Sequence, residues 1–206
     1  MARDGLLVDW GGVLTTDLFA SFAAFAEQEG LDTAQVRTLF RDDRDARRLL
    51  VDLETGAITE EEFEPRLAEA LGVAEHAGMI DRMMAGAQPD PVMITAVRAA
   101  RNAGVRTGLV SNSWGTRRYP RDLLGELFDG IVISGEEGTR KPDPRMYELG
   151  VERIGLPAGA CVYVDDLAFN LEPAAALGMA TVHHTDAGTT VAELERLLGR
   201  ELRAPD

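Results

Sequence analysis

The residues that could do chemistry lie in four short segments, each at or near the end of an apolar stretch. These segments are VDWGGVL at 8–14, VSNSW at 110–114, TRKPDP at 139–144 and VDD at 164–166. They supply an aspartate, a serine with an asparagine, a lysine and a pair of adjacent aspartates. In one crevice, these groups would suit the transfer of a phosphoryl group to a carboxylate.

The charges of these side chains match the needs of that reaction. A carboxylate such as Asp9 cannot approach a phosphate dianion unless cations reduce the repulsion between them. Mg²⁺ held by carboxylates, with Lys141 opposite, would supply this positive charge. The adjacent Asp165 and Asp166 repel each other, and a bound cation explains them economically. Asp9 would then be free to attack phosphorus and form an aspartyl-phosphate that water later cleaves.

The elements that would bring these residues together are short apolar strands. We expect strands, each rich in Val, Ile or Leu, at 6–10, 107–110, 131–133, 161–164 and 180–182. Their continuous apolarity is typical of parallel strands that are covered on both faces. Helical patterns alternate with them at 91–102, 144–154, 171–177 and 191–202. The sequence therefore predicts an α/β fold with a doubly wound parallel sheet.

In such a sheet, residues that follow neighbouring strands converge on one crevice. Ser111 and exposed backbone amides near Gly12 and Asn112 could hold the phosphoryl oxygens there.

The segment from 17 to 88 interrupts the alternation of strands and helices. It contains only helical patterns, separated by Gly30, Gly56 and Gly72, and a capping box in which Thr59 is paired with Glu62. We predict a core domain at 1–16 and 89–206 and an all-helical cap domain at 17–88, inserted where such sheets bind ligands. The tail at 203–206 is expected to fray.

Composition excludes several classes of protein. The chain has 206 residues, enough for one large domain or a core with a smaller insert, and a formal net charge of −14. This acidity, without any basic run, argues against binding to nucleic acid or to an anionic membrane. We find neither an apolar signal core nor a segment long enough to span a bilayer. The single cysteine, Cys161, excludes an internal disulfide and fits a reducing cytosol, so we expect a cytoplasmic protein.

The four segments resemble, in order, the motifs of the haloacid dehalogenase (HAD) superfamily. DWGGVLT is similar to the D-x-D-G-[TV]-[LI]-T loop of that family, SNS to its [ST]-N motif, RKPDPRMY to its lysine motif and VDDLAFN to its acidic motif. LETGAITEEEFEPRL resembles helices of the cap in relatives of the epoxide hydrolase N-terminal phosphatase domain. The resemblance covers nearly the whole chain. It implies a Rossmann-like HAD core and the phosphatase branch with a small helical cap.

The resemblance also implies a role for each matching residue. Asp9 would be the nucleophile and a Mg²⁺ ligand, and Lys141 would neutralise charge. The remaining positions would bind phosphate or metal: phosphate at Gly12, Ser111 and Asn112, and Mg²⁺ at the backbone oxygen of Gly11, at Asp166 and, indirectly or through water, at Asp165.

Gly11 departs from the pattern of the family. The phosphatases usually have a second aspartate there, which protonates the leaving group and then activates water, a contribution of about 10²–10⁴-fold in rate. Three explanations follow. In the first, the substrate has a leaving group that needs little protonation, such as an anomeric, acyl or aryl phosphate. In the second, a metal-bound water or a nearby residue such as Asp17 replaces the acid. Alternatively, the site binds without turnover. The first two are favoured because the other motifs are intact.

The resemblance favours a Mg²⁺-dependent phosphatase acting on a small phosphorylated metabolite, with no nucleic-acid or membrane partner. One alternative is a metal-free 2-haloacid dehalogenase, in which Asp9 attacks carbon; the retained Asp165 and Asp166 argue against it. The other is a non-catalytic protein that binds a phosphorylated ligand. The sequence does not distinguish a monomer from a homodimer.

Overall fold

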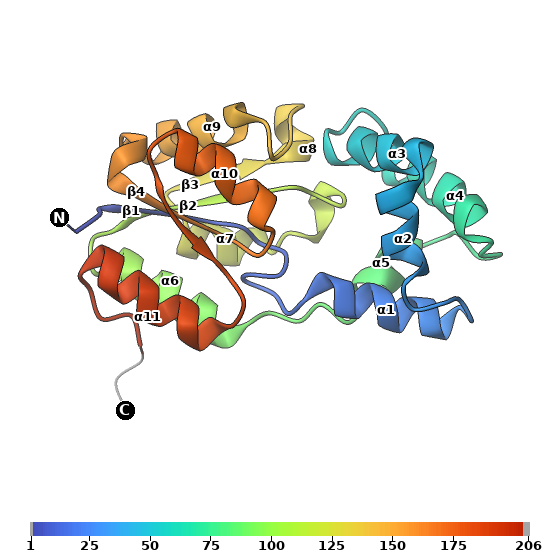
Figure 1. The fold of residues 1–206 in the computed structure, drawn as a ribbon, viewed down its shortest axis with the longest axis horizontal. Helices are drawn as coiled ribbons and strands as arrows, with labels where there is room; N and C mark the ends of the chain where they lie inside the picture. The colour runs from blue at the N-terminus through green and yellow to red at the C-terminus, as the bar shows by residue number, and fades with distance from the viewer. Residues whose placement is uncertain (1, 204–206) are drawn as a thin grey trace.

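A five-stranded parallel sheet forms the centre of the fold in the computed structural model, which describes residues 2–203 (Figure 1). Its strands are β1 (Gly5–Val8), β2 (Arg106–Ser111), β3 (Gly130–Ile133), β4 (Cys161–Asp165) and β5 (Ala180–His183). The spatial order is β3-β2-β1-β4-β5, and every neighbouring pair is parallel. The predicted fold class is confirmed, and all five predicted strands are present, although β1 ends at Val8 rather than at residue 10.

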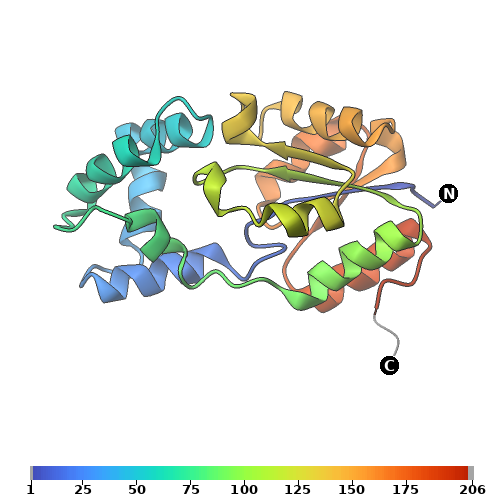
Figure 2. The ribbon, with the colours of Figure 1, turned by 180° about the vertical axis from the view of Figure 1, so that it is seen from behind.

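Helices cover both faces of this sheet. Because successive strand residues point to opposite faces, Leu6 and Val8 pack on one side and Leu7 on the other. The helices on the side of Leu6 and Val8 are α6 (Pro91–Asn102), α7 (Arg121–Leu127) and α11 (Ala187–Leu198). Those on the side of Leu7 are α9 (Pro144–Ile154) and α10 (Ala168–Ala176). Short helical turns complete the connections: η1 (Thr116–Arg118), α8 (Ser134–Glu137) and η2 (Ala158–Ala160). The two layers are seen from behind in Figure 2.

Five further helices lie beyond the carboxyl ends of the strands (Figure 1). They are α1 (Leu18–Gln28), α2 (Gln35–Asp42), α3 (Arg44–Glu54), α4 (Glu60–Leu71) and α5 (Met79–Met84), here called the α1–α5 group. This group has its own hydrophobic cluster, which includes Phe25, Phe63 and Leu67. No strand lies between residues 17 and 88, as expected, and the Thr59–Glu62 capping box is present.

Two predicted helices have different bounds. Helix α10 begins at Ala168 rather than at 171. Helix α11 spans Ala187–Leu198 rather than 191–202, because Asp186 accepts a hydrogen bond from the Thr189 N–H at its start and Gly199, with φ +63°, ends it. Leu202 is nevertheless fully buried. The expected fraying concerns Arg203 and three residues outside the described part of the chain. No helix described here is both long and apolar enough to cross a bilayer.

Candidate active site

The predicted site residues meet at the carboxyl edge of the three central strands. Asp9 follows β1, Ser111 ends β2 and Asp165 ends β4. The chain builds the sheet outward from β1 to β3 and then returns to β4 on the other side of β1. A doubly wound sheet opens its ligand crevice at such a reversal, because the connections on the two sides diverge there. Strand order therefore explains why residues more than 150 positions apart, such as Asp9 and Asp166, share one site.

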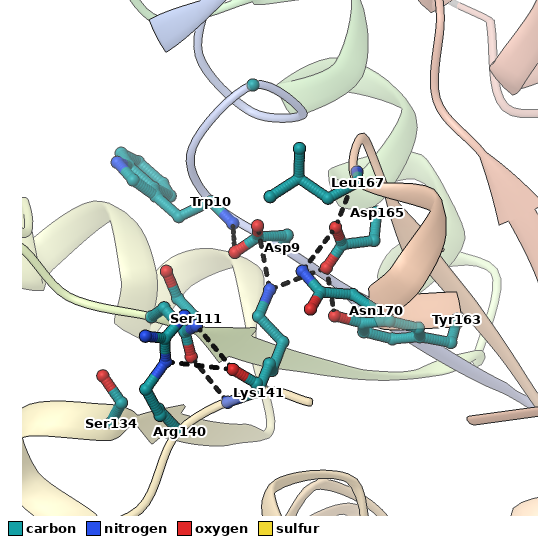
Figure 3. A network of polar contacts seen from close by, with 12 residues as sticks. Asp9, Trp10, Ser111, Ser134, Arg140, Lys141, Tyr163, Asp165, Leu167 and Asn170 are labelled. Carbon is teal, nitrogen blue, oxygen red and sulfur yellow. Dashed lines mark hydrogen bonds and ion pairs between the residues drawn. The ribbon is translucent and has the colours of Figure 1, made fainter. Parts of the chain in front are cut away.

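Lys141 lies at the centre of this cluster (Figure 3). Its side chain is fully buried, and its Nζ lies 2.8 Å from Asp9 Oδ2 and 2.7 Å from Asp165 Oδ2. Burial opposes the charge on this ammonium, but the two carboxylates outweigh burial and raise the pKa of Lys141 above its usual value. Lys141 therefore carries a fixed positive charge beside Asp9.

Asn112 holds the backbone of Lys141 in place. The Lys141 N–H donates to Asn112 Oδ1 at 2.8 Å, and Asn112 Nδ2 donates to the Lys141 carbonyl at 3.1 Å. This paired contact uses both ends of the amide. The side chain expected to bind phosphate is thus engaged in positioning the lysine, 29 residues further along the chain.

Asp165 is held by contacts on both of its oxygens. Its Oδ1 accepts hydrogen bonds from the Leu167 N–H at 2.9 Å and from Asn170 Nδ2 at 3.0 Å, while Oδ2 accepts from Lys141 Nζ and the Tyr163 hydroxyl. Burial alone would raise the pKa of Asp165, but Lys141 and these hydrogen bonds outweigh it and lower that pKa. Asp165 is therefore an ionised anchor for the lysine.

Asp9 and Asp166, unlike Asp165, have raised pKa values. Burial, reinforced by Asp165 and opposed in part by Lys141, raises the pKa of Asp9 to about 6. Burial, together with the charges of Asp9 and Asp165, raises the pKa of Asp166 to about 7. One ammonium thus stands among three carboxylates. The excess of negative charge favours a further cation.

The donor set fits a magnesium ion. Asp9, Asp165 and Asp166 each offer a carboxylate oxygen within 4.8 Å of the other two. Mg²⁺ prefers oxygen ligands at about 2.0–2.1 Å and keeps several waters, so two direct carboxylates and water-mediated contacts suit it. Asp165 is the least suited to direct ligation, since its two oxygens accept four hydrogen bonds, whereas each oxygen of Asp9 has one such contact.

The glycine loop after Asp9 makes room for Asp166. Gly12 has φ +73°, and a Cβ built at this position would lie 2.4 Å from Asp166 Oδ2. Its N–H already donates to Thr15 Oγ1 at 3.1 Å, so this amide is engaged within the loop. Gly11 lines the cavity described below. Asp17, considered as a substitute acid, is exposed and its carboxylate caps helix α1 through the Phe19 N–H.

A cavity of about 380 Å³ adjoins Ser111, Asn112 and Gly11. The Ser111 hydroxyl is buried and lies 2.8 Å from the hydroxyl of Tyr119, a residue that the sequence analysis missed. Nothing local marks Tyr119 as part of a site. Only the loop after β2, which returns over its own strand, reveals this contact.

Glu54 is a second residue that the sequence analysis missed. It ends α3 and is 4% exposed, with Oε2 at 2.8 Å from Arg140 Nη1. Burial raises the pKa of Glu54 to about 7, against the opposing effect of Arg140 and Lys141. The Arg140 guanidinium is thus engaged in an ion pair with Glu54.

Comparison with known proteins identifies the family of this chain. Residues 4–178 match the family model of the haloacid dehalogenase-like hydrolases. The chain belongs to this family. It is 32% identical, over 151 residues, to a sesquiterpene phosphatase of Aspergillus oryzae, covering 71% of this chain and 77% of that protein. It is 28% identical, over 142 residues, to the bifunctional epoxide hydrolase 2 of Rattus norvegicus, covering 66% of this chain.

The extent of these matches differs. This HAD-like hydrolase spans only 25% of the length of the epoxide hydrolase. It spans 10% of the length of another curated relative, the acyl-CoA dehydrogenase family member 10 of Mus musculus. Among solved structures, a HAD family enzyme from Bacteroides thetaiotaomicron, crystallised as a magnesium complex, has a TM-score of 0.69 at 21% identity. The match covers 95% of this chain and 100% of that one. That likeness concerns the fold.

Proposed function

We propose that this HAD-like hydrolase is a Mg²⁺-dependent phosphomonoester hydrolase that acts on a small phosphorylated metabolite through Asp9. The observation that carries the proposal is the buried Lys141, which bridges Asp9 and Asp165 at 2.8 and 2.7 Å beside the third carboxylate, Asp166. The sesquiterpene phosphatase among its relatives supports the same class of reaction.

Asp9 is the proposed nucleophile because hydrogen bonding holds its carboxylate in place and a neighbouring ammonium balances its charge. The Trp10 N–H donates to its Oδ1 at 2.7 Å and Lys141 contacts its Oδ2. Attack by a carboxylate oxygen forms a bond to phosphorus and breaks the bond between phosphorus and the leaving oxygen. Water then attacks the phosphorus of the aspartyl-phosphate, releasing inorganic phosphate and regenerating Asp9.

Lys141 stabilises the charge that builds up on the phosphoryl oxygens, and Ser111 offers a hydroxyl from the end of β2. Mg²⁺, held by Asp9, Asp166 and the backbone oxygen of Gly11 with Asp165 in an indirect role, would add positive charge against the phosphate. The α1–α5 group, within residues 17–88, would act as a cap that keeps bulk water from the reaction.

The carboxylate cluster also separates this proposal from a metal-free haloacid dehalogenase. The substrate of such an enzyme is itself a carboxylate, and burial together with the neighbouring carboxylates already raises the pKa values of Asp9 and Asp166. Release of chloride from 2-chloropropanoate in EDTA, faster than phosphate release from any ester in Mg²⁺, would replace the proposed reaction by dehalogenation.

The direct test compares Asp9→Asn with the wild type on a panel of phosphomonoesters, with Mg²⁺ and with EDTA. We expect Asp9→Asn to lower kcat by about three orders of magnitude, because the amide is a poor nucleophile. EDTA should lower the wild-type rate comparably. The matched control is Asp122→Asn, at an exposed position in the first turn of α7, which should keep the wild-type rate. Equal rates for the wild type and Asp9→Asn would refute the proposal.

A further inference from the structure

The cavity beside the carboxylate cluster is lined mainly by hydrocarbon. Its volume is about 380 Å³, within the range of pockets that enclose a small organic molecule. It extends from Ser111 and Gly11 to the space between the α1–α5 group and the loop after β2. Its main apolar walls are Trp10, Leu18, Met84, Pro89, Trp114 and Tyr119.

The charged side chains that line this cavity are already paired. Among the described residues they are Asp81 and Arg118, whose Oδ1 and Nη2 atoms lie 2.7 Å apart. Arg118 also pairs with Glu60 at 2.7 Å, and Asp81 with Arg117 at 2.6 Å. These four residues therefore neutralise one another. They leave little attraction for a charged group on the substrate besides the phosphate itself.

The hydroxyl and amide side chains of the wall make contacts within the protein. Thr15 Oγ1 accepts from the Gly12 N–H and donates to the Thr16 carbonyl, both at 3.1 Å. The hydroxyls of Tyr119 and Ser111 contact each other, and the amide of Asn112 bonds to the backbone of Lys141. A leaving group rich in hydroxyls, such as a sugar, would lose water here and find few equivalent partners.

The side chain of Leu18 packs in front of Gly11. A Cβ built on Gly11 would lie 2.6 Å from Leu18 Cδ1. The wall of the cavity at Gly11 and Leu18 is therefore hydrocarbon, where the phosphatases of this family usually carry a second aspartate. A leaving oxygen that departs along this wall has no acidic side chain from position 11 to protonate it.

We propose that the substrate is an aryl phosphomonoester, whose leaving group is a flat apolar ring bearing the ester oxygen. This inference rests on the proposed function. When the bond from phosphorus to that oxygen breaks, the oxygen keeps the electron pair and the ring delocalises it. A phenol has a pKa of about 10, as in tyrosine, against about 15.7 for water. The phenolate can therefore leave unprotonated and take its proton from solvent afterwards. The ring packs against Trp10, Trp114 and Leu18.

The experiment uses four substrates that vary polarity and leaving-group basicity independently. They are 1-naphthyl phosphate, cyclohexylmethyl phosphate, acetyl phosphate and glycerol 3-phosphate. We expect kcat/KM to be highest for 1-naphthyl phosphate, by about tenfold or more over each of the others. An equal value for cyclohexylmethyl phosphate overturns the leaving-group argument. An equal or higher value for acetyl phosphate or glycerol 3-phosphate overturns the apolar pocket.

A variant of the wall tests the pocket directly. Leu18→Asn keeps a side chain of similar shape but makes it polar. It should lower the ratio of kcat/KM for 1-naphthyl phosphate to that for acetyl phosphate by about tenfold. Val92→Asn, at a position that is 52% exposed on α6, is the matched control and should leave this ratio unchanged. An unchanged ratio in a folded Leu18→Asn protein overturns the inference.

A binding measurement separates failure of this inference from failure of the proposed function. Phenylphosphonate and methylphosphonate carry similar anionic groups and cannot be hydrolysed as esters. Calorimetric titration in Mg²⁺ should give a Kd for phenylphosphonate at least about tenfold lower than that for methylphosphonate. Binding of phenylphosphonate should also change the tryptophan fluorescence. If no ester is hydrolysed but this preference holds, the proposed reaction fails and the apolar pocket stands. Equal Kd values overturn the pocket whatever the rates.

Discussion

Gly12 lies in the left-handed region of backbone conformation, at φ +73°, and faces the carboxylate of Asp166. Two constraints therefore act at one position. The φ value disfavours any side chain, and the 2.4 Å separation from Asp166 Oδ2 leaves no room for a Cβ. The orientation of Asp166, and with it the proposed Mg²⁺ site, depends on the absence of a side chain at residue 12.

We predict that Gly12→Ala weakens metal binding more than it weakens the fold. Displacement of the Asp166 carboxylate should raise the Mg²⁺ concentration needed for half-maximal activity by about tenfold or more, measured by titration of phosphate release. Gly30→Ala is the control, because Gly30 has nearly the same φ, +71°, and nothing within 4 Å of a Cβ. Identical Mg²⁺ titrations for the two variants would contradict a steric role for Gly12 at the metal site.

At the scale of elements, the loop after β2 joins the sheet to the α1–α5 group. Trp114 packs against Phe22 of α1, Phe40 of α2 and Phe63 of α4, with ring centroids 5.1, 5.6 and 6.0 Å apart. Two residues of η1, Arg117 and Arg118, form the ion pairs with α4 and α5 described above. One loop thus carries Ser111 and Asn112 at its start and anchors the helices that cover them.

Removal of the Trp114 indole should therefore destabilise the protein, as truncation of a buried core side chain does. We expect Trp114→Ala to lower the free energy of unfolding by about 3 kcal/mol, the lower end of the range for buried aromatic residues, since Trp114 is only partly buried. Urea denaturation measures this. Phe169→Ala on α10, where the side chain is 51% exposed, should change stability by no more than about 0.5 kcal/mol. Similar losses in both variants would show that Trp114 does not anchor the helices.

At the scale of the whole molecule, Glu54 places a titratable group of α3 against the segment that carries Lys141. Its backbone carbonyl accepts from Ser134 Oγ and its carboxylate pairs with Arg140. Lys141 also favours the ionised form of Glu54, while burial and the charge of Asp9 favour the protonated form. The balance raises the pKa of Glu54 from an ordinary 4.5 to about 7.

This shift implies a pH dependence of stability. Between pH 4.5 and 7 the folded protein holds a proton on Glu54 that the unfolded chain has lost, so this group lowers the free energy of unfolding as pH rises through that window. The full effect is at most about 3 kcal/mol. Glu54→Gln should reduce the fall in the free energy of unfolding between pH 4.5 and 7, measured by urea denaturation in EDTA. Glu69→Gln, at an exposed position of α4, should leave this fall unchanged. Parallel pH profiles for the wild type and Glu54→Gln would contradict the assignment.

Much of this architecture follows from local patterns. Each strand is a short apolar run that only a buried parallel sheet accommodates, and the polar residues after β1, β2 and β4 must then share one edge. That reasoning was enough to bring Asp9, Ser111 and the Asp165–Asp166 pair together. The helical segment between 17 and 88 was equally readable, because its capping box and glycine breaks are local signals.

The contacts that each of these side chains makes depend on the tertiary structure. The amide of Asn112 holds Lys141 rather than standing free, Glu54 reaches Arg140 across 86 positions of the chain, and Leu18 fills the space beside Gly11. None of these contacts has a periodic or local signature, since each depends on where two distant segments come to lie. Local sequence patterns thus predicted which chemical groups gather at the sheet edge. Packing determined which of them remain available to a substrate, because burial and pairing are properties of neighbours that only the folded chain brings together.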